Sequence, residues 1–192
     1  MKRLLSVAAV LALTASPAFA HPGHDVSSFA AGIAHPLAGI DHIAVMVAVG
    51  LWAALKGGRA LWAWPAAFVG VMSVGAALGM AHIALPLVEP GILASVVVLG
   101  LMVTLAVDLP VAMGAVLIGA FALLHGHAHG SEVAENIGGI AYMAGFALAT
   151  ATLHLVGIGF AQLMARAQLG PAIRVAGALC VAVGAGLYAG VI

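Results

Sequence analysis

The chain has 192 residues, of which 65% are hydrophobic and only 6% are charged, whereas soluble domains carry about 25% charged residues. This composition excludes a soluble globular protein and leaves room for several membrane-spanning helices of about 20 residues each. The formal net charge is zero with histidine neutral and there is one cysteine, so neither a nucleic-acid partner nor a thiolate-rich metal site is indicated.

Residues 1–20 are typical of an export signal. Two basic residues near the start precede a short apolar stretch, residues 4–13, and a small-x-small cleavage pattern follows. Cleavage would leave residues 21–34 as a histidine-containing periplasmic N-terminus, and an uncleaved signal anchor is the alternative. The sequence leaves open whether His21 and His24 in this segment bind metal.

Residues 35–192 are predicted to form a transmembrane domain of six helices, which makes the fold class an all-α membrane helix bundle. Proline, glycine and charged residues divide the apolar sequence. The predicted spans are residues 36–55, 61–85, 91–107, 109–124, 137–163 and 171–191. One span in place of the third and fourth would be about 50 Å long, well beyond a hydrocarbon core of about 30 Å. We therefore predict two short spans there.

The cations of the mature chain test this count, because cytoplasmic loops are enriched in lysine and arginine. With the N-terminus outside, Lys56 and Arg59 fall in the first inside loop, and the two remaining arginines flank the last inside loop. The outside loops, which include Glu89 and residues 125–136, contain no lysine or arginine. The sequence thus predicts a multi-pass protein of the bacterial inner membrane with a periplasmic N-terminus.

The first span opens on HPLAGIDH, residues 35–42. On a continuous helix His35 and His42 would lie about 10 Å apart, too far for one ion with ligands near 2.1 Å. Either the proline and glycine of the motif loosen the turn, or the residues form successive stations along a path. A carboxylate in a span usually faces a partner or a watery cavity, so we interpret Asp41 as functional rather than as a helix-start acid.

A second histidine cluster, HGHAHGSE, occupies residues 125–132. On a helix, His125, His129 and Glu132 would point the same way, whereas an extended chain would align the three histidines, His127 included. Either geometry gives a chelate. A favourable acid in the first turn of the next helix is the alternative for Glu132 alone.

Two further residues complete the candidate ligands. Glu89 lies in an outside loop, and His154 is predicted deeper, toward the inner half of the fifth span. A later station on an ion path and a hydrogen bond to a neighbouring helix are both open interpretations of His154. Small residues four apart in segments 75–79 and 186–190 also predict close approach of helices.

These motifs resemble those of the HupE/UreJ family of nickel and cobalt permeases. HPLAGIDH is similar to the family's His, five residues, Asp-His motif, and HGHAHGSE to its His-Gly-x-Ala-His-Gly-x-Glu motif. The exported N-terminus and LPLVEP, which contains Glu89, extend the resemblance over the mature chain. The resemblance implies these functional positions: His35, Asp41, His42, His125, His129 and Glu132, with Glu89 in addition. His127 stands at a variable position, and Leu124 replaces a common aromatic residue.

Imidazole and carboxylate ligands suit borderline divalent ions such as Ni²⁺, Co²⁺ and Zn²⁺, and nickel follows from the resemblance alone. We predict a permease and not an enzyme, with the ion as cargo and no prosthetic group. The resemblance alone also implies metalloenzyme maturation as the purpose. An intramembrane zinc-dependent hydrolase using the same histidines is the alternative, and a bis-histidine haem protein is a third class. Whether the protein is a channel or a carrier, and whether it forms a homo-oligomer, stay open.

Overall fold

The computed structural model describes residues 28–133 and 138–191, and all regular elements in these residues are helical. In chain order they are α2 (Ser28–Ala34), the 3₁₀ turn η1 (His35–Leu37), α3 (Ile40–Lys56), α4 (Ala60–Met80), α5 (Val88–Thr104), α6 (Val111–Ser131), α7 (Gly139–Arg166) and α8 (Gly170–Tyr188). This confirms the predicted all-α membrane bundle. The predicted export signal and the two histidines that follow it lie outside the described residues.

The helices follow the six predicted spans, with unequal lengths. In the described part of the chain, α4, α6, α7 and α8 are each long and apolar enough to cross a membrane. The segment from α2 through η1 to α3 passes the same test as a pair bent by 81°. Helix α5 has 17 residues, or about 25 Å at 1.5 Å per residue. The structure thus contains four spans, or five when the bent pair is counted, together with one shorter apolar helix.

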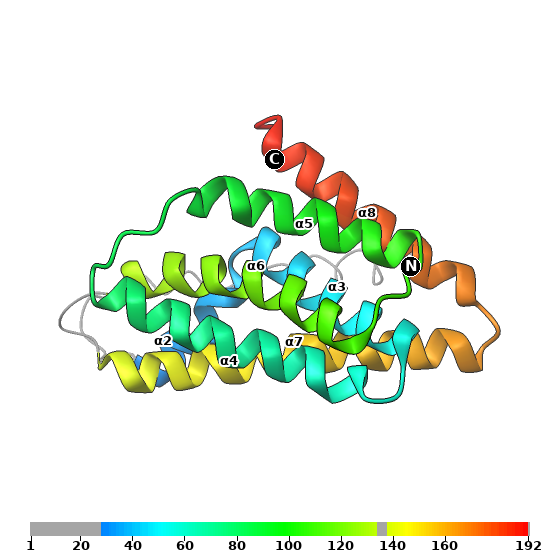
Figure 1. Cartoon of the computed structure of the whole chain (residues 1–192), viewed down its shortest axis with the longest axis horizontal. Coiled ribbons are helices and arrows are strands. Elements are labelled where there is room, and N and C mark those ends of the chain that lie inside the picture. Colours follow the sequence, from blue (N-terminus) through cyan, green and yellow to red (C-terminus); the bar gives the residue numbers. More distant parts are fainter. Residues whose placement is uncertain (1–27, 134–137, 192) are drawn as a thin grey trace, which may run out of the picture.

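The helix ends gather at two opposite poles of the bundle (Figure 1). The loops from α3 to α4, from α5 to α6 and from α7 to α8 lie at one end, which we call the cationic pole. It holds all four cations of the described residues: Lys56, Arg59, Arg166 and Arg174. There Lys56 pairs with Asp108, and Arg174 Nε donates to the Thr104 carbonyl at 2.7 Å. The end of α6 and the loop from α4 to α5 lie at the other end, which we call the histidine pole.

Tryptophans pack the core next to the cationic pole. The rings of Trp52 in α3 and Trp64 in α4 lie 4.3 Å apart between centroids, and both are fully buried. Each indole N–H donates to a backbone carbonyl, Trp52 to Val107 at 2.8 Å and Trp64 to Val111 at 2.9 Å. These bonds tie the central helix α3 and its neighbour α4 to the α5–α6 connection.

Helix α6 extends further than the sequence predicts. Residues 125–136 are predicted to form an outside loop, but residues 125–131 belong to the last two turns of α6. The extended alternative for the three clustered histidines is therefore wrong, and the helical alternative is confirmed. The predicted boundary failed because Gly126 and Gly130 read as helix breakers, whereas both serve a contact between helices.

Glycines four residues apart bring α4 and α6 into backbone contact. Each helix contributes two glycines at which an added Cβ would collide with a carbonyl oxygen of the other helix. The pairs are Gly75 with Leu123, Gly79 with His127, Gly126 with Met72 and Gly130 with Ala76. Small residues at this spacing allow such an approach, which confirms the prediction for segment 75–79. In segment 186–190, by contrast, Gly190 lies beyond α8 with a φ of 66° and open space around it.

We expect Gly126→Ala to destabilise the bundle, because the new Cβ would meet the backbone of Met72, which cannot rotate away. Overpacking of this kind costs about 1–3 kcal/mol. The midpoint of thermal unfolding in detergent should fall by about 2–12 °C. Gly70→Ala on α4 is the matched control, because a Cβ there meets no atom within 4 Å, and its midpoint should not fall. Equal midpoints for the two variants would contradict the described α4–α6 contact.

Candidate metal centre

The bend between η1 and α3 brings the two histidines of the opening motif to one place. Gly39, at the break, has the extended backbone φ −93°, ψ 117° and precedes the first turn of α3. As a result the rings of His35 and His42 both contact His129 of α6, with centroids 4.9 and 5.1 Å away. The turn is thus loosened at Gly39, as the first alternative for this motif requires, but His35 and His42 belong to two different groups of candidate ligand atoms, as the second alternative requires.

Three side chains form an outer set of ligands at the surface of the histidine pole. His35 Nε2 lies 3.0 Å from His129 Nδ1 and 3.1 Å from Glu132 Oε2, and His129 Nδ1 lies 3.4 Å from the same carboxylate oxygen. The side chains of Glu132 and His35 are 55% and 38% exposed, and that of His129 is 15% exposed. The outer set therefore combines two imidazoles with a carboxylate that water reaches.

Three imidazoles form an inner set directly beneath the outer one. It consists of His42, His125 and His129, whose candidate ligand atoms all lie within 4.8 Å of one another. The centroids of His42 and His125 are 5.5 Å apart, and both rings are fully buried. Because His129 belongs to both sets, the two sets are continuous, and exposure falls from the outer set to the inner set.

An aromatic side chain that the sequence analysis missed covers these rings from α7. The ring of Phe146 lies 4.7 Å from that of His129, 5.0 Å from His42 and 6.2 Å from His35. Phenylalanine gave no signal because it is ordinary in an apolar span. Leu124, which replaces the family's common aromatic residue, packs instead on Gly91 of α5. Phe146 thus supplies an aromatic surface against the histidines.

Two buried hydroxyl groups also contact the inner set. Thr150 Oγ1 of α7 lies 3.2 Å from His42 Nε2, and Ser95 Oγ of α5 lies 2.8 Å from His125 Nε2. The sequence analysis did not select either residue. Both are polar residues inside apolar spans, where such residues are rare, and this could have drawn attention to them. Only the tertiary structure shows which histidine each one contacts.

Three predicted ligands lie at the histidine pole but outside both sets, as far as the described residues show. Asp41, in the first turn of α3, has its carboxyl group against Gly39. His127 Nε2 donates to the Ile83 carbonyl at 2.7 Å, in the loop between α4 and α5. Glu89 is exposed in the first turn of α5. The helical spacing places His127 on a different face from its two neighbours in the cluster.

His154 lies deeper, as the sequence predicts, and is apart from both sets. It follows Thr150 by one turn on the buried face of α7, or about 6 Å further along the helix. Its ring is fully buried, with a centroid 5.2 Å from that of Phe68, and neither ring nitrogen has a hydrogen-bond partner in the described part of the chain. The alternative of a hydrogen bond to a neighbouring helix is therefore not observed.

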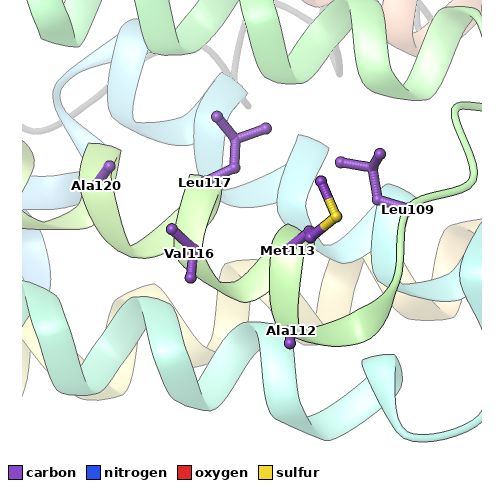
Figure 2. A pocket seen from close by; sticks show the side chains of 6 residues that line it. All are labelled: Leu109, Ala112, Met113, Val116, Leu117 and Ala120. Atoms are coloured by element: carbon purple, nitrogen blue, oxygen red, sulfur yellow. The ribbon is translucent and has the colours of Figure 1, made fainter.

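An open apolar groove of about 560 Å³ lies elsewhere on α6 (Figure 2). It is lined by Leu109, Ala112, Met113, Val116, Leu117 and Ala120. These side chains offer no nitrogen or carboxylate oxygen to an ion. The candidate ligands of α6 therefore lie in its last two turns.

Comparisons with known proteins were made for the whole chain. The profile of the family described as HupE / UreJ protein matches residues 9–187. A curated relative, Protein HupE of Rhizobium leguminosarum bv. viciae, is 44% identical over 188 residues, which cover 98% of each chain. No solved structure matches the chain.

We expect His129→Ala to abolish tight Co²⁺ binding, because this ring serves both the outer and the inner set. Loss of a ligand's hydrogen-bond partner alone costs about 10–100-fold in metal affinity, so loss of the shared ligand should exceed about 100-fold. The measurement is a Co²⁺ titration of the purified protein followed by visible absorption.

His127→Ala is the matched control for this titration. It removes the same side chain two residues away, where the ring bonds the Ile83 carbonyl instead of another ligand. We expect its affinity to equal that of the wild type. Equal losses in the two variants would show that the described arrangement of the cluster is wrong.

Proposed function

The chain belongs to the HupE/UreJ family, and on this basis we propose that it is an inner-membrane permease for divalent transition metal ions, nickel or cobalt. The observation that carries the proposal is the position of His129, which is shared by an outer set whose other members are exposed to water and an inner set whose other members, His42 and His125, are fully buried. This sharing supports movement of an ion from the surface into the bundle.

The outer set has the chemistry needed to receive an ion. Imidazole and carboxylate suit borderline divalent metals, and the exposed carboxylate of Glu132 offsets part of the ion's charge while water still reaches the site. In this proposal His35, His129 and Glu132 replace part of the hydration shell. Asp41 and Glu89, which lie at the same pole, add negative charge near the point of arrival.

The inner set has the chemistry needed to pass the ion on. His129 keeps hold of the ion while His42 and His125 replace His35 and Glu132. Conduction requires binding that is favourable enough to attract the ion and weak enough to release it. Three neutral imidazoles without a carboxylate meet that requirement better than a charged, closed cage.

His154 is the next station in this proposal. Its ring nitrogens have no hydrogen-bond partner in the described residues, and it lies one turn below Thr150, which contacts the inner set. Beyond it the Trp52 and Trp64 rings, in contact at an interplanar angle of 39°, fill the core. Release of the ion at the cationic pole therefore requires these rings to separate, which makes a helix rearrangement part of the cycle.

The distribution of charge supports the direction of transport. Cytoplasmic ends of membrane proteins are enriched in lysine and arginine, and the four cations of the described residues are all at the cationic pole. We therefore propose that the histidine pole faces the periplasm and that uptake is inward, supplying metalloenzyme maturation. Cleavage after residue 20, a periplasmic segment 21–34 and a transmembrane domain 35–192 belong to the same proposal.

We expect proteoliposomes that contain the protein to accumulate ⁶³Ni²⁺ over time. His42→Ala removes an inner ligand and His129→Ala the shared ligand, so both should reduce the initial rate to that of empty liposomes. His82→Ala is the matched control, because His82 lies in the exposed turn after α4 and in neither ligand set. Its rate should equal that of the wild type.

Two outcomes of this assay would contradict the permease. One is accumulation that is unaffected by the His42 and His129 variants, provided that they are folded. The other is stoichiometric binding of metal with no lumenal accumulation, which would favour a resident-metal enzyme such as the zinc-dependent hydrolase.

We also expect uptake to weaken as the pH falls from about 7.5 to about 5.5, because imidazole binds metal only when deprotonated and an unperturbed imidazole titrates near pH 6.5. Protons then compete with the ion for the ligands. The measurement is the initial ⁶³Ni²⁺ rate with equal pH on both sides of the membrane, so that no proton gradient drives transport. A rate that stays flat over this range would contradict this prediction and show that no ligand needed for uptake gains a proton there.

A further inference from the structure

Each buried ligand of the inner set has one hydroxyl partner, and the hydrogen atoms of these hydroxyls can be accounted for. Ser95 Oγ donates to the carbonyl of Ile92 at 2.6 Å. A serine hydroxyl has a single hydrogen, so in its 2.8 Å contact with His125 Nε2 the oxygen accepts. His125 therefore has its proton on Nε2.

Thr150 gives the same result for His42. Its hydroxyl donates to the Met72 sulfur at 3.7 Å, a weak acceptor, but one that uses the single hydrogen of the group. When the hydroxyl donates to this sulfur, the threonine oxygen accepts in its 3.2 Å contact with His42 Nε2. This assignment of the hydroxyl hydrogen places the proton of His42, like that of His125, on Nε2.

The other nitrogen of each ring is consequently an unprotonated acceptor. His42 Nδ1 and His125 Nδ1 are buried and have no hydrogen-bond partner in the described residues. Leaving a buried acceptor unpaired costs about 1–3 kcal/mol. Both rings belong to one group of imidazoles whose candidate ligand atoms lie within 4.8 Å of one another, and a cation bound by both Nδ1 atoms would satisfy the two acceptors at once.

We propose that Ser95 and Thr150 are positioning residues that hold His125 and His42 in the Nε2-protonated tautomer and so present Nδ1 of both rings to the ion. Neither hydroxyl touches the ion itself. This inference rests on the proposed function, because it takes the inner set as an ion site, and it deepens that function by naming the ligand atoms and the groups that orient them.

A hydroxyl group as the hydrogen-bond partner of a histidine ligand fits transport better than the partner found at permanently bound metals. A metal-bound histidine commonly donates its second N–H to a carboxylate or a backbone carbonyl, which raises the basicity of the ligand. Ser95 and Thr150 are neutral, and each of their oxygens is itself part of a chain that ends on Ile92 or Met72. They orient the rings without adding a negative charge, so the ion is held less tightly.

The chain supplies matched controls for both hydroxyls. Ser73 in α4 and Thr152 in α7 donate to carbonyls of their own helices, Val69 and Leu148, each at 2.8 Å. Both are exposed. Ser73→Ala and Thr152→Val therefore remove the same groups as Ser95→Ala and Thr150→Val, but away from the histidines.

The first test reads the tautomers directly in the metal-free protein. ¹⁵N NMR of histidine-labelled protein distinguishes Nδ1 from Nε2 protonation, and His42→Ala and His125→Ala assign the two signals. We expect both rings to be protonated on Nε2 in the wild type and in the Ser73 and Thr152 controls. We expect a mixture of tautomers at His125 in Ser95→Ala. Nδ1 protonation of either ring in the wild type would overturn the inference.

The second test measures Ni²⁺ affinity. We expect Ser95→Ala and Thr150→Val to weaken binding by about 10–100-fold, and Thr150→Ser, which keeps the hydroxyl, to restore it. Wild-type affinity in folded Ser95→Ala and Thr150→Val would overturn the inference while leaving the permease intact. Conversely, a wild-type protein with the expected tautomers and tight binding, but without accumulation of ⁶³Ni²⁺, would contradict the permease and leave this inference standing.

Discussion

The structure depends on one constraint, namely that imidazole nitrogens are buried in a bundle with little other polar chemistry. His42, His125 and His154 together bury four ring nitrogens that have no hydrogen-bond partner in the described residues, and each such atom costs about 1–3 kcal/mol. These four nitrogens lie on the faces of α3, α6 and α7 that meet, whereas a fifth unpartnered nitrogen in the described residues, His127 Nδ1, lies outside both ligand sets. Buried polar atoms that lack hydrogen-bond partners and lie close together are typical of functional sites.

Close helix packing is what makes this arrangement rigid enough to be useful. The glycine contacts between α4 and α6 hold the last two turns of α6, and with them His125 and His129, against a neighbouring backbone. The same device joins α3 to α7, where a Cβ at Gly50 would collide with the carbonyl of His154 and one at Gly157 with that of Val47. These backbone contacts fix the positions of the helices, so the histidine side chains can change rotamer while their Cα atoms stay in place.

The sequence selected the candidate ligands, but only the structure shows how they are grouped. Helical spacing placed His129 and Glu132 on one face, and the alternation of the spans brought His35 and His42 to the same pole. The bend at Gly39 could not be predicted, because proline and glycine permit a break without requiring one. The Ser95 and Thr150 contacts were equally out of reach, since they join residues that are 30 and 108 positions apart from their histidines. The motif alone did not show that His127 lies on a different face of the helix, where its ring contacts the Ile83 carbonyl.

The order of the two ligand sets explains why a carboxylate belongs at the surface and not in the core. Two unit charges 4 Å apart interact by about 4 kcal/mol at an effective dielectric constant of 20, and a dication doubles this attraction. Glu132 in the exposed outer set can assist capture of the ion, because solvent screens its charge and so limits the strength of its attraction to the ion. A carboxylate in the buried inner set would hold the dication too firmly for release. In the proposed cycle, neutral imidazoles with hydroxyl partners avoid this trap. The shared His129 would keep one protein ligand on the ion while the other ligands exchange, so the ion would pass between the sets without losing protein coordination.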